Sequence, residues 1–296
     1  MVEEKNFDAW PELEGLAEGS GTSEKLWLQS PDGTVRGLFK FPKYEDGTPW
    51  KITSEHISEW LAAQLGKLVG VACAEVELGY RNERIGSFSH LLTGPEEALV
   101  EGVNFICEAY PQYDAGDMID KADGTRYCLD FILRSTQDYI PTQEWVEMLL
   151  FDFLIGNSDR HQSNWALLRG ADQMYRRCPL YDNGSSLCCY VPEEKLDSNF
   201  FKDQGRIKSL TDTKSLSQIR INGQEKRRPT HRAVLEYLFS NYQRIAKAIS
   251  KRFCAQLTIG KIESILDQLP ETMISTQRKR LISMFLDEKM RILASF

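Results

Sequence analysis

The chain has 296 residues, of which 42% are hydrophobic and 27% are charged, and its formal net charge is −7. This length can bury a large core in one or two domains, and the composition is that of a globular protein. The acidic balance argues against a protein whose whole surface binds nucleic acid, although it leaves room for a local basic patch. The most apolar run, 145–155, is interrupted by two acidic residues and is too short to span a bilayer, so no membrane partner is expected.

The first residues and the cysteines bear on the compartment. The N-terminus is acidic and has no basic leader followed by an apolar core, so we expect no signal peptide. Seven cysteines are scattered along the chain, which is an odd number. This pattern is typical of free thiols in a reducing compartment rather than of a disulfide framework. We therefore expect a cytoplasmic protein.

The first part of the chain predicts a small α+β unit. Residues 1–18 are acidic and are expected to form a short helix or an ordered arm. Ser54 is a candidate N-cap for a helix that runs to about Val69. Four strands are expected in two hairpins, at 26–28 with 35–41 and at 71–80 with 84–90, the first closed by a Pro-Asp-Gly turn.

The remainder of the chain is predicted to be mostly helical. Residues 142–144 open the apolar helix 145–155, which stops at Gly156 and Asn157. Residues 202–231 are polar and are expected to form a surface segment. Further helices are expected at 233–253, 259–269 and 275–293, and a small hairpin at 165–168 with 178–181.

A break in the pattern separates the two parts. Residues 93–97, Thr-Gly-Pro-Glu-Glu, interrupt the apolar periodicity. We therefore expect a sheet-bearing N-lobe at 1–98 and a larger helical C-lobe at 99–296, which makes the fold class α+β. A cleft between the lobes is where a nucleotide would bind.

The most informative stretch is GNSDRHQSN at 156–164, which is followed by PLYDNG at 179–184. Asp159 can accept the proton of an attacking hydroxyl, and Asn164 and Asp182 offer the hard oxygen ligands that Mg²⁺ prefers. Each residue alone is common in turns. An Asp, an Asn five residues later and a second Asp before a Gly together are the parts that phosphoryl transfer needs. The string therefore predicts a phosphoryl-transfer enzyme in which these three residues are catalytic.

Neighbouring residues are expected to support this site. His161 is placed at the cofactor site as a support of the loop, with direct chemistry as the weaker alternative. Arg160 steadies the loop or the phosphates, or is simply solvated. Asn157 is expected to hold the turn after the helix. Asp152, within the apolar helix, is expected to be a hydrogen-bonded structural carboxylate.

In the small lobe, Lys40 lies on the second expected strand and could reach the donor phosphates, although a strand lysine is often a solvated edge residue. Glu55 and Glu59 begin the next helix and could pair with Lys40, or simply favour the helix dipole. A Gly-rich segment precedes the first strand, and its backbone could approach phosphate, although it is not a Walker P-loop. Its candidate cofactor-binding residues are Gly19, Ser20, Gly21, Thr22 and Ser23.

Together these segments resemble the HipA-like kinases, a bacterial protein-kinase-like family, and the resemblance covers most of the chain. The matching strings are SEKLWL at 23–28, LFK at 38–40, SE at 54–55, NSDRHQSN at 157–164 and PLYDNG at 179–184. The last two are specific, whereas the first three gain weight from their order and spacing. The resemblance implies a bilobal protein-kinase-like fold that uses ATP and Mg²⁺ to phosphorylate Ser or Thr of a protein substrate.

The resemblance also implies a role for each matching residue. Asp159 would be the catalytic Asp, and Asn164 and Asp182 would bind magnesium. Lys40 would contact the ATP phosphates, and Glu55 would orient Lys40.

The resemblance further suggests partners and regulation. Family members are often toxins that an antitoxin neutralises, whereas short members act as secreted or effector-like kinases. The chain is expected to lack the extra N-terminal subdomain of full-length toxins, so a small partner that carries this piece is expected. In relatives the Gly-rich loop is a site of inhibitory self-phosphorylation. Here Ser20, Thr22 and Ser23 are the available hydroxyls, and a phosphate on them would repel the ATP phosphates.

Two other functions compete with a protein kinase. Lipid kinases use a similar loop but usually carry a basic segment after the second Asp, and here 185–194 has none before the cluster 226–228. This argues against an anionic lipid headgroup but not against a small neutral alcohol. A pseudokinase that only binds its partners is the second rival. The intact set of Asp159, Asn164 and Asp182 argues against it.

Overall fold

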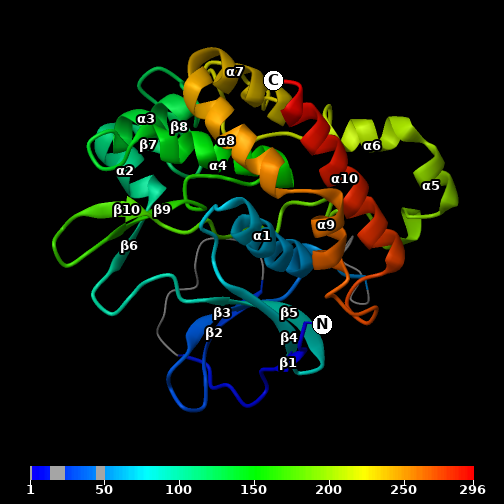
Figure 1. Cartoon of the computed structure of the whole chain (residues 1–296). Helices are drawn as coiled ribbons and strands as arrows, with labels where there is room; N and C mark the ends of the chain where they lie inside the picture. Colours follow the sequence, from blue (N-terminus) through cyan, green and yellow to red (C-terminus); the bar gives the residue numbers. More distant parts are fainter. Residues whose placement is uncertain (1, 14–23, 45–50) are drawn as a thin grey trace.

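The molecule has a small lobe built on a sheet and a larger lobe built from helices (Figure 1). The computed structural model describes residues 2–13, 24–44 and 51–296. The Gly-rich segment with Gly19, Ser20, Gly21, Thr22 and Ser23 therefore lies outside the described residues. The α+β fold class and the two lobes agree with the expectation from the sequence. No helix within the described ranges is long and apolar enough to cross a membrane.

The small lobe is a five-stranded sheet in the order β1-β4-β5-β3-β2. Both expected hairpins form, β2 with β3 and β4 with β5. The N-terminal arm is a short strand parallel to β4, so the alternative of a helix there was wrong. The strands are β1 (Lys5–Asn6), β2 (Lys25–Gln29), β3 (Arg36–Lys40), β4 (Val76–Arg81) and β5 (Arg84–His90).

One face of this sheet has its own aromatic core, and helix α1 (Glu55–Val69) contacts β4 and β5. Ser54 occupies the N-cap position of α1 as expected, but its side chain makes no capping hydrogen bond. The aromatic core is sealed by rings from β3, β5 and the N-terminal arm, which keeps β3 and its Lys40 in place. It consists of Phe7, Leu28, Phe39, Phe41 and Phe88.

The larger lobe is organised around α4 (Thr142–Ile155), in which every side chain from Trp145 to Ile155 is buried. The helix is buried all round because other helices of this lobe pack against several of its sides. The other helices are α2 (Gly102–Ala109), α3 (Leu129–Thr136), α5 (Ser198–Lys202), α6 (Gln204–Thr211), α7 (His231–Asn241), α8 (Gln243–Gln256), α9 (Ile259–Leu266) and α10 (Thr276–Ala294). Small strands complete it: β6 (Ala98–Glu101), β7 (Tyr113–Asp114), β8 (Ile119–Asp120), β9 (Ala166–Arg169) and β10 (Tyr175–Arg177).

Two predictions for this lobe are wrong, and the surface segment predicted at 202–231 contains a helix that was not expected. The expected helix 233–253 is two helices, because Tyr242 leaves the helical conformation with φ of −128°. The polar segment 202–231 contains helix α6, which packs against α10. The partner of β9 is 175–177 rather than 178–181, because a tight turn closed from Gly170 to Met174 brings the chain back early.

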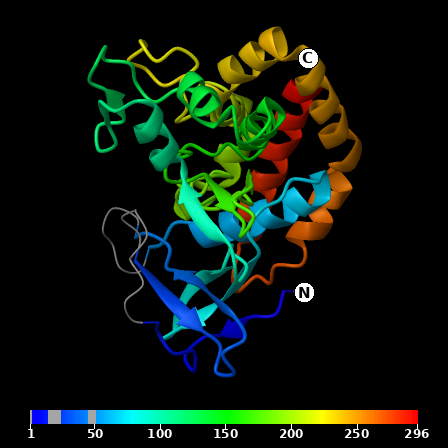
Figure 2. The ribbon, with the colours of Figure 1, turned by 90° about the vertical axis from the view of Figure 1, so that its left-hand side faces the viewer.

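The residues 178–181 instead connect the two lobes. The Leu180 backbone donates to Ala72 O and accepts from Ala74 N, each at 2.8 Å. Ser58 of α1 donates to Ser186 O at 2.9 Å. Figure 2 shows α1, in light blue, between the sheet and the helices of the larger lobe. The segment that carries Asp182 is therefore held against the small lobe by backbone pairing.

Candidate active site

The turn after α4 positions residues 157–164, which carry residues predicted to be catalytic and are called here the catalytic loop. Gly156 ends the helix in the left-handed conformation, with φ of 69°. Asn157 Oδ1 then accepts from Asp159 N at 3.0 Å, and its Nδ2 donates to Asp152 Oδ1 at 3.3 Å. Both the turn role expected for Asn157 and the structural role expected for Asp152 are confirmed by these contacts. His161 Nδ1 accepts from Ser163 N at 3.2 Å, so His161 also supports the loop.

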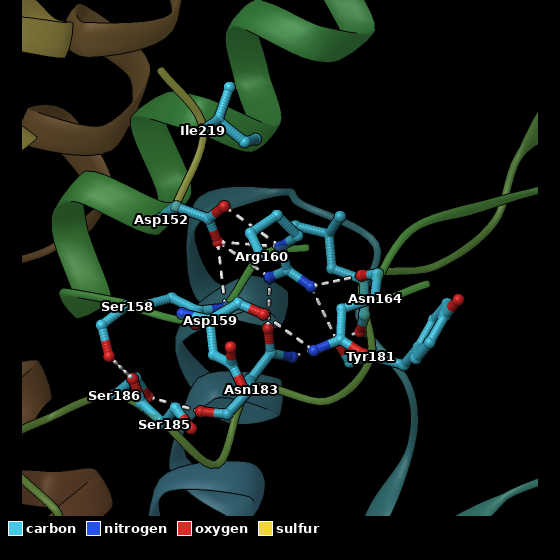
Figure 3. Close-up of polar contacts among 12 residues, drawn as sticks. Asp152, Ser158, Asp159, Arg160, Asn164, Tyr181, Asn183, Ser185, Ser186 and Ile219 are labelled. Atoms are coloured by element: carbon cyan, nitrogen blue, oxygen red, sulfur yellow. Dashed lines mark hydrogen bonds and ion pairs between the residues drawn. The ribbon is translucent and has the colours of Figure 1, made fainter. Parts of the chain in front are cut away.

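Arg160 is almost fully buried and joins the catalytic loop to PLYDNG at 179–184, called here the second motif (Figure 3). Its Nη2 donates to Asp152 Oδ1 at 2.8 Å and to Asn183 Oδ1 at 2.7 Å. Its Nη1 donates to the backbone oxygens of Asn164 and Tyr181, at 2.8 and 2.7 Å. The planar guanidinium fork matches these acceptors. Of the roles considered from the sequence, steadying the loop is the one the contacts show.

Of the two expected metal ligands, Arg160 contacts the backbone of Asn164 and both sequence neighbours of Asp182. Asn164 is buried and its Nδ2 donates to Asp159 O at 2.8 Å, which leaves its Oδ1 available as a hard ligand. Asp182 has a φ of 54°, in the left-handed region that Asp adopts more readily than most other non-glycine residues. An amide oxygen and a carboxylate are donors that fit Mg²⁺, which binds few protein ligands and keeps water or phosphate in its other positions.

Lys40 extends from β3 to the second motif. Its Nζ lies 2.9 Å from Asp182 Oδ1 and 3.3 Å from Glu59 Oε1. The expected orienting role of Glu55 is therefore corrected, because Glu59, one turn further along α1, makes this contact. Glu59 Oε2 also accepts from Asn183 N at 2.9 Å, so this buried carboxylate contacts both the lysine and the loop that carries Asp182.

Glu55 has different partners around the end of β3. It accepts from Lys43 N at 3.0 Å and from Thr53 Oγ1 at 2.7 Å, and Lys43 Nζ lies 3.4 Å from its other oxygen. Tyr190 donates to Glu55 Oε1 at 2.8 Å. Lys43 and Glu55 thus form a second lysine–glutamate pair, separate from the pair of Lys40 and Glu59.

The charges of the site follow from burial and from these pairs. Burial alone would raise the pKa of Asp182, but the Lys40 ammonium, together with His161 and Arg160, outweighs this effect and the pKa is lowered. Burial raises the pKa of Asp159, His161 opposes the rise, and the Asp182 carboxylate adds to it. Asp182 therefore stays ionised as a metal ligand needs, while Asp159 gains basicity as a proton acceptor needs.

Two cavities adjoin the Lys40–Asp182 pair. One, of about 310 Å³, is mostly apolar and is also lined by Asn164. The other, of about 230 Å³, is lined by Lys40, Asp182, Asp159 and His161 together with Lys43 and Glu55. A cavity of about 600 Å³ between the β4–β5 turn and residues 271–278 includes none of Lys40, Asp159, Asn164 and Asp182, so its size does not mark the site.

The apolar cavity was not predicted from the sequence. Its lining residues include members of β2, β3, the segment after β5 and the second motif. These segments lie far apart in the sequence, so no motif of fixed spacing contains them together. Leu91 and Leu92, just before the expected break at 93–97, were the local signal that an apolar surface lies there. The apolar lining residues are Trp27, Leu38, Leu91, Leu92, Leu99 and Tyr181.

Comparison with known proteins agrees with this arrangement. Residues 18–274 match the profile of the HipA-like C-terminal domain. The Ser/Thr-protein kinase CtkA of Helicobacter pylori is 29% identical over 268 residues, which cover 85% of this chain and 75% of CtkA. The crystal structure of the Helicobacter pylori proinflammatory kinase CtkA superimposes with a TM-score of 0.81 at 19% identity, covering 99% of this chain and 98% of that chain.

A more distant structural match comes from a toxin–antitoxin system. It is a chain of the Shewanella oneidensis MR-1 complex of HipA, HipB and operator DNA, with a TM-score of 0.53 at 14% identity. The match covers 97% of this chain and 65% of that chain. Both superpositions establish the fold, and the profile covers most of the sequence. The protein therefore belongs to the HipA-like kinase family, and its enzyme class is that of the phosphotransferases.

Proposed function

We propose that the protein is an ATP- and Mg²⁺-dependent Ser/Thr protein kinase. The observation that carries the proposal is the contact between Lys40 and Asp182 at 2.9 Å, at the meeting point of an apolar and a charged cavity. A lysine on a small-lobe strand and an Asp on a large-lobe loop are the groups that hold donor phosphates and metal in kinases. The Ser/Thr-protein kinase CtkA supports the choice of acceptor.

The binding of the donor is assigned to the two cavities. The adenine would fill the apolar cavity, and the phosphates would lie beside Lys40 in the charged one. Asn164 Oδ1 and Asp182 would hold Mg²⁺, which neutralises charge on the phosphates when it is bound. Arg160 keeps these two ligands in register, because it donates both to Asn164 O and to Asn183 Oδ1 in the loop of Asp182.

Transfer to the acceptor is assigned to Asp159. The half-buried carboxylate would accept the proton from a Ser or Thr hydroxyl as that oxygen bonds to the phosphorus, and the bond to the leaving oxygen of the donor breaks. Burial raises the pKa of this carboxyl, which brings its basicity closer to that needed near neutral pH. The alignment of the acceptor hydroxyl with the donor phosphate would further accelerate the transfer.

The test compares the wild-type protein with Asp159→Ala. Both are incubated with labelled ATP and Mg²⁺ in the presence of a generic protein, a lipid extract or a sugar alcohol. Label on Ser or Thr of protein with the wild type alone is the expected result. Label only on lipid or sugar would replace the proposed acceptor class, and equal absence of label with both proteins would favour a pseudokinase.

The proposal extends to regulation and to a protein partner. Self-phosphorylation of Ser20, Thr22 or Ser23 would place negative charge where the donor phosphates bind. Unchanged self-labelling and activity after all three are replaced by Ala would contradict this.

A small antitoxin-like or N-subdomain-like partner is proposed because the matched structure comes from a complex of HipA with HipB. Co-expression with the protein encoded next to this chain, followed by size-exclusion chromatography, tests the partner.

A further inference from the structure

Five basic residues lie on segments that contact one another beside the catalytic loop, in a chain whose net charge is −7. They are Arg126, Arg220, Lys226, Arg227 and Arg228, called here the basic cluster. Backbone contacts hold them together. Arg126 N donates to Gly223 O at 2.8 Å, and Arg220 forms a β-bridge with Cys128. Arg220 also donates to Glu225 O and Lys226 O, at 3.1 and 3.2 Å, so it lies against the loop that carries the other members.

Arg228 connects the basic cluster to the proposed base. Its Nη1 donates to Ser158 O at 3.0 Å, directly before Asp159, and to Gln218 Oε1 at 2.6 Å. Figure 3 shows Ser158 at the opposite end of the catalytic loop from Asn164 and Tyr181, which line the apolar cavity. The basic cluster therefore borders the acceptor end of the site rather than the nucleoside end.

The positive charges of the basic cluster are not balanced by carboxylates. Among the residues that the structure describes, none of the five members lies within ion-pair distance of an Asp or Glu side chain, whereas Arg84, Arg177 and Arg278 all do. Burial and the nearby Arg126 and Arg228 lower the pKa of Arg220. Like charges held together in this way repel one another, and an anion bound among them would relieve the repulsion.

Donors remain for such an anion. Lys226 and Arg227 are exposed, and Arg126 and Arg228 are half-buried. Arg228 uses Nη1 for the protein contacts given above, so its Nε and Nη2 can donate elsewhere. Carboxylates accept pairs of hydrogen bonds from guanidinium groups, which makes these bonds stronger and more selective than those of neutral groups.

We propose that the basic cluster binds acidic residues of the protein substrate that flank the acceptor hydroxyl. This inference rests on the proposed kinase function and adds a substrate class to it. An acidic peptide is favoured over nucleic acid by two observations. The segment 216–230 contains no aromatic residue on which bases could stack, and the acidic remainder of the chain would repel a long polyanion.

The variant for the test is Arg126→Gln with Lys226→Gln and Arg227→Gln, which spares Arg220 and Arg228 because these two hold backbone oxygens. The matched control removes the same charge from the exposed residues Arg244, Lys247 and Lys251 of α8. Substrates are a Ser peptide with Asp and Glu flanks and the same peptide with Asn and Gln. The cluster variant should lose about tenfold in kcat/KM for the acidic peptide, as expected for lost charge-assisted contacts, while the control should match the wild type.

Binding is measured separately, so that failure of transfer is not confused with failure of docking. A fluorescent acidic peptide with Ala in place of Ser should bind the wild type without ATP, more weakly at high salt, and poorly to the cluster variant. Docking without any transfer would refute the kinase proposal alone. Equal transfer to acidic and neutral peptides would overturn the substrate class. Tighter, cluster-dependent binding of a single-stranded oligonucleotide would overturn it in favour of nucleic acid.

Discussion

The Lys40 ammonium of β3 lies 2.9 Å from the Asp182 carboxylate, although the two residues are separated by 142 positions in the sequence. Glu59 contributes to the same group of charges, at 3.3 Å from Lys40, and its other oxygen accepts from Asn183 N. A strand and a helix of the small lobe thus meet the Asp182 loop of the large lobe at one point. Opposite charges hold this meeting point together, so each of the three side chains is expected to matter for donor binding.

Glu59→Gln and Glu55→Gln should affect the enzyme differently. Glu59→Gln removes the charge that pairs with Lys40, so kcat/KM for ATP should fall by about tenfold or more, because the lysine–glutamate pair must be in place for transfer. Glu55→Gln changes only the Lys43 side of the site and should leave kcat/KM for ATP within about threefold of the wild-type value. Steady-state kinetics at varied ATP concentration measure both. A larger loss with Glu55→Gln would restore the assignment made from the sequence.

Asp182→Asn should nearly abolish transfer. The substitution keeps the shape of the side chain but removes a charged metal ligand, and metal stabilisation of the transition state is worth several kcal/mol, or more than about a hundredfold in kcat. Asp172→Asn, in an exposed turn, serves as the control. Single-turnover rates at saturating Mg²⁺ are the measurement. Near-normal turnover of Asp182→Asn would mean that the metal binds elsewhere.

Substitution of Arg160 should destabilise the fold as well as the site. Breaking a buried ion pair leaves an unpaired charge, here on Asp152, at a cost of about 3–5 kcal/mol. Arg160→Lys should not rescue stability, because a compact ammonium cannot contact four separate acceptors in one plane. Urea denaturation followed by circular dichroism measures the free energy of unfolding. The double variant Asp152→Asn with Arg160→Met should lose less than the sum of the single losses, and strict additivity would contradict a shared network.

Lys289 of α10 predicts an unusual pH dependence of stability. The side chain is fully buried, and burial lowers its pKa from 10.5 to about 7. Its Nζ donates to Ser215 Oγ at 2.8 Å. Ser215 Oγ in turn lies 2.9 Å from His231 Nδ1, and His231 Nε2 lies 2.9 Å from Asn157 O. The lysine therefore connects α10 to the turn before the catalytic loop.

The sign of the effect follows from proton binding. Between pH 7 and 10.5 the unfolded chain keeps the proton on Lys289 while the folded chain releases it. The unfolded state binds more protons in this window, so the contribution of Lys289 makes the protein more stable as pH rises, by at most about 1.4 kcal/mol per pH unit. Lys289→Met should remove this slope from the free energy of unfolding, whereas Lys251→Met, at an exposed position, should keep it. Parallel profiles for Lys289→Met and the wild type would contradict the low pKa.

Much of this protein was predictable from local sequence. Gly156 ends an apolar helix, and the five-residue step from Asp159 to Asn164 spans one loop, so these positions are fixed by short-range geometry. The two hairpins of the small lobe follow from alternating strands joined by turn residues. The family resemblance rests on the same short strings.

Only the tertiary structure decided how these parts meet. Glu55 and Glu59 lie one turn apart on the same side of α1, so their spacing could not say which one contacts Lys40. The apolar pattern of 233–253 continues across Tyr242, which hid the break between α7 and α8. The apolar cavity and the fourfold contacts of Arg160 join segments far apart in the chain. Periodicity and spacing report what neighbours along the sequence can do, whereas contacts between distant segments depend on packing of the whole fold.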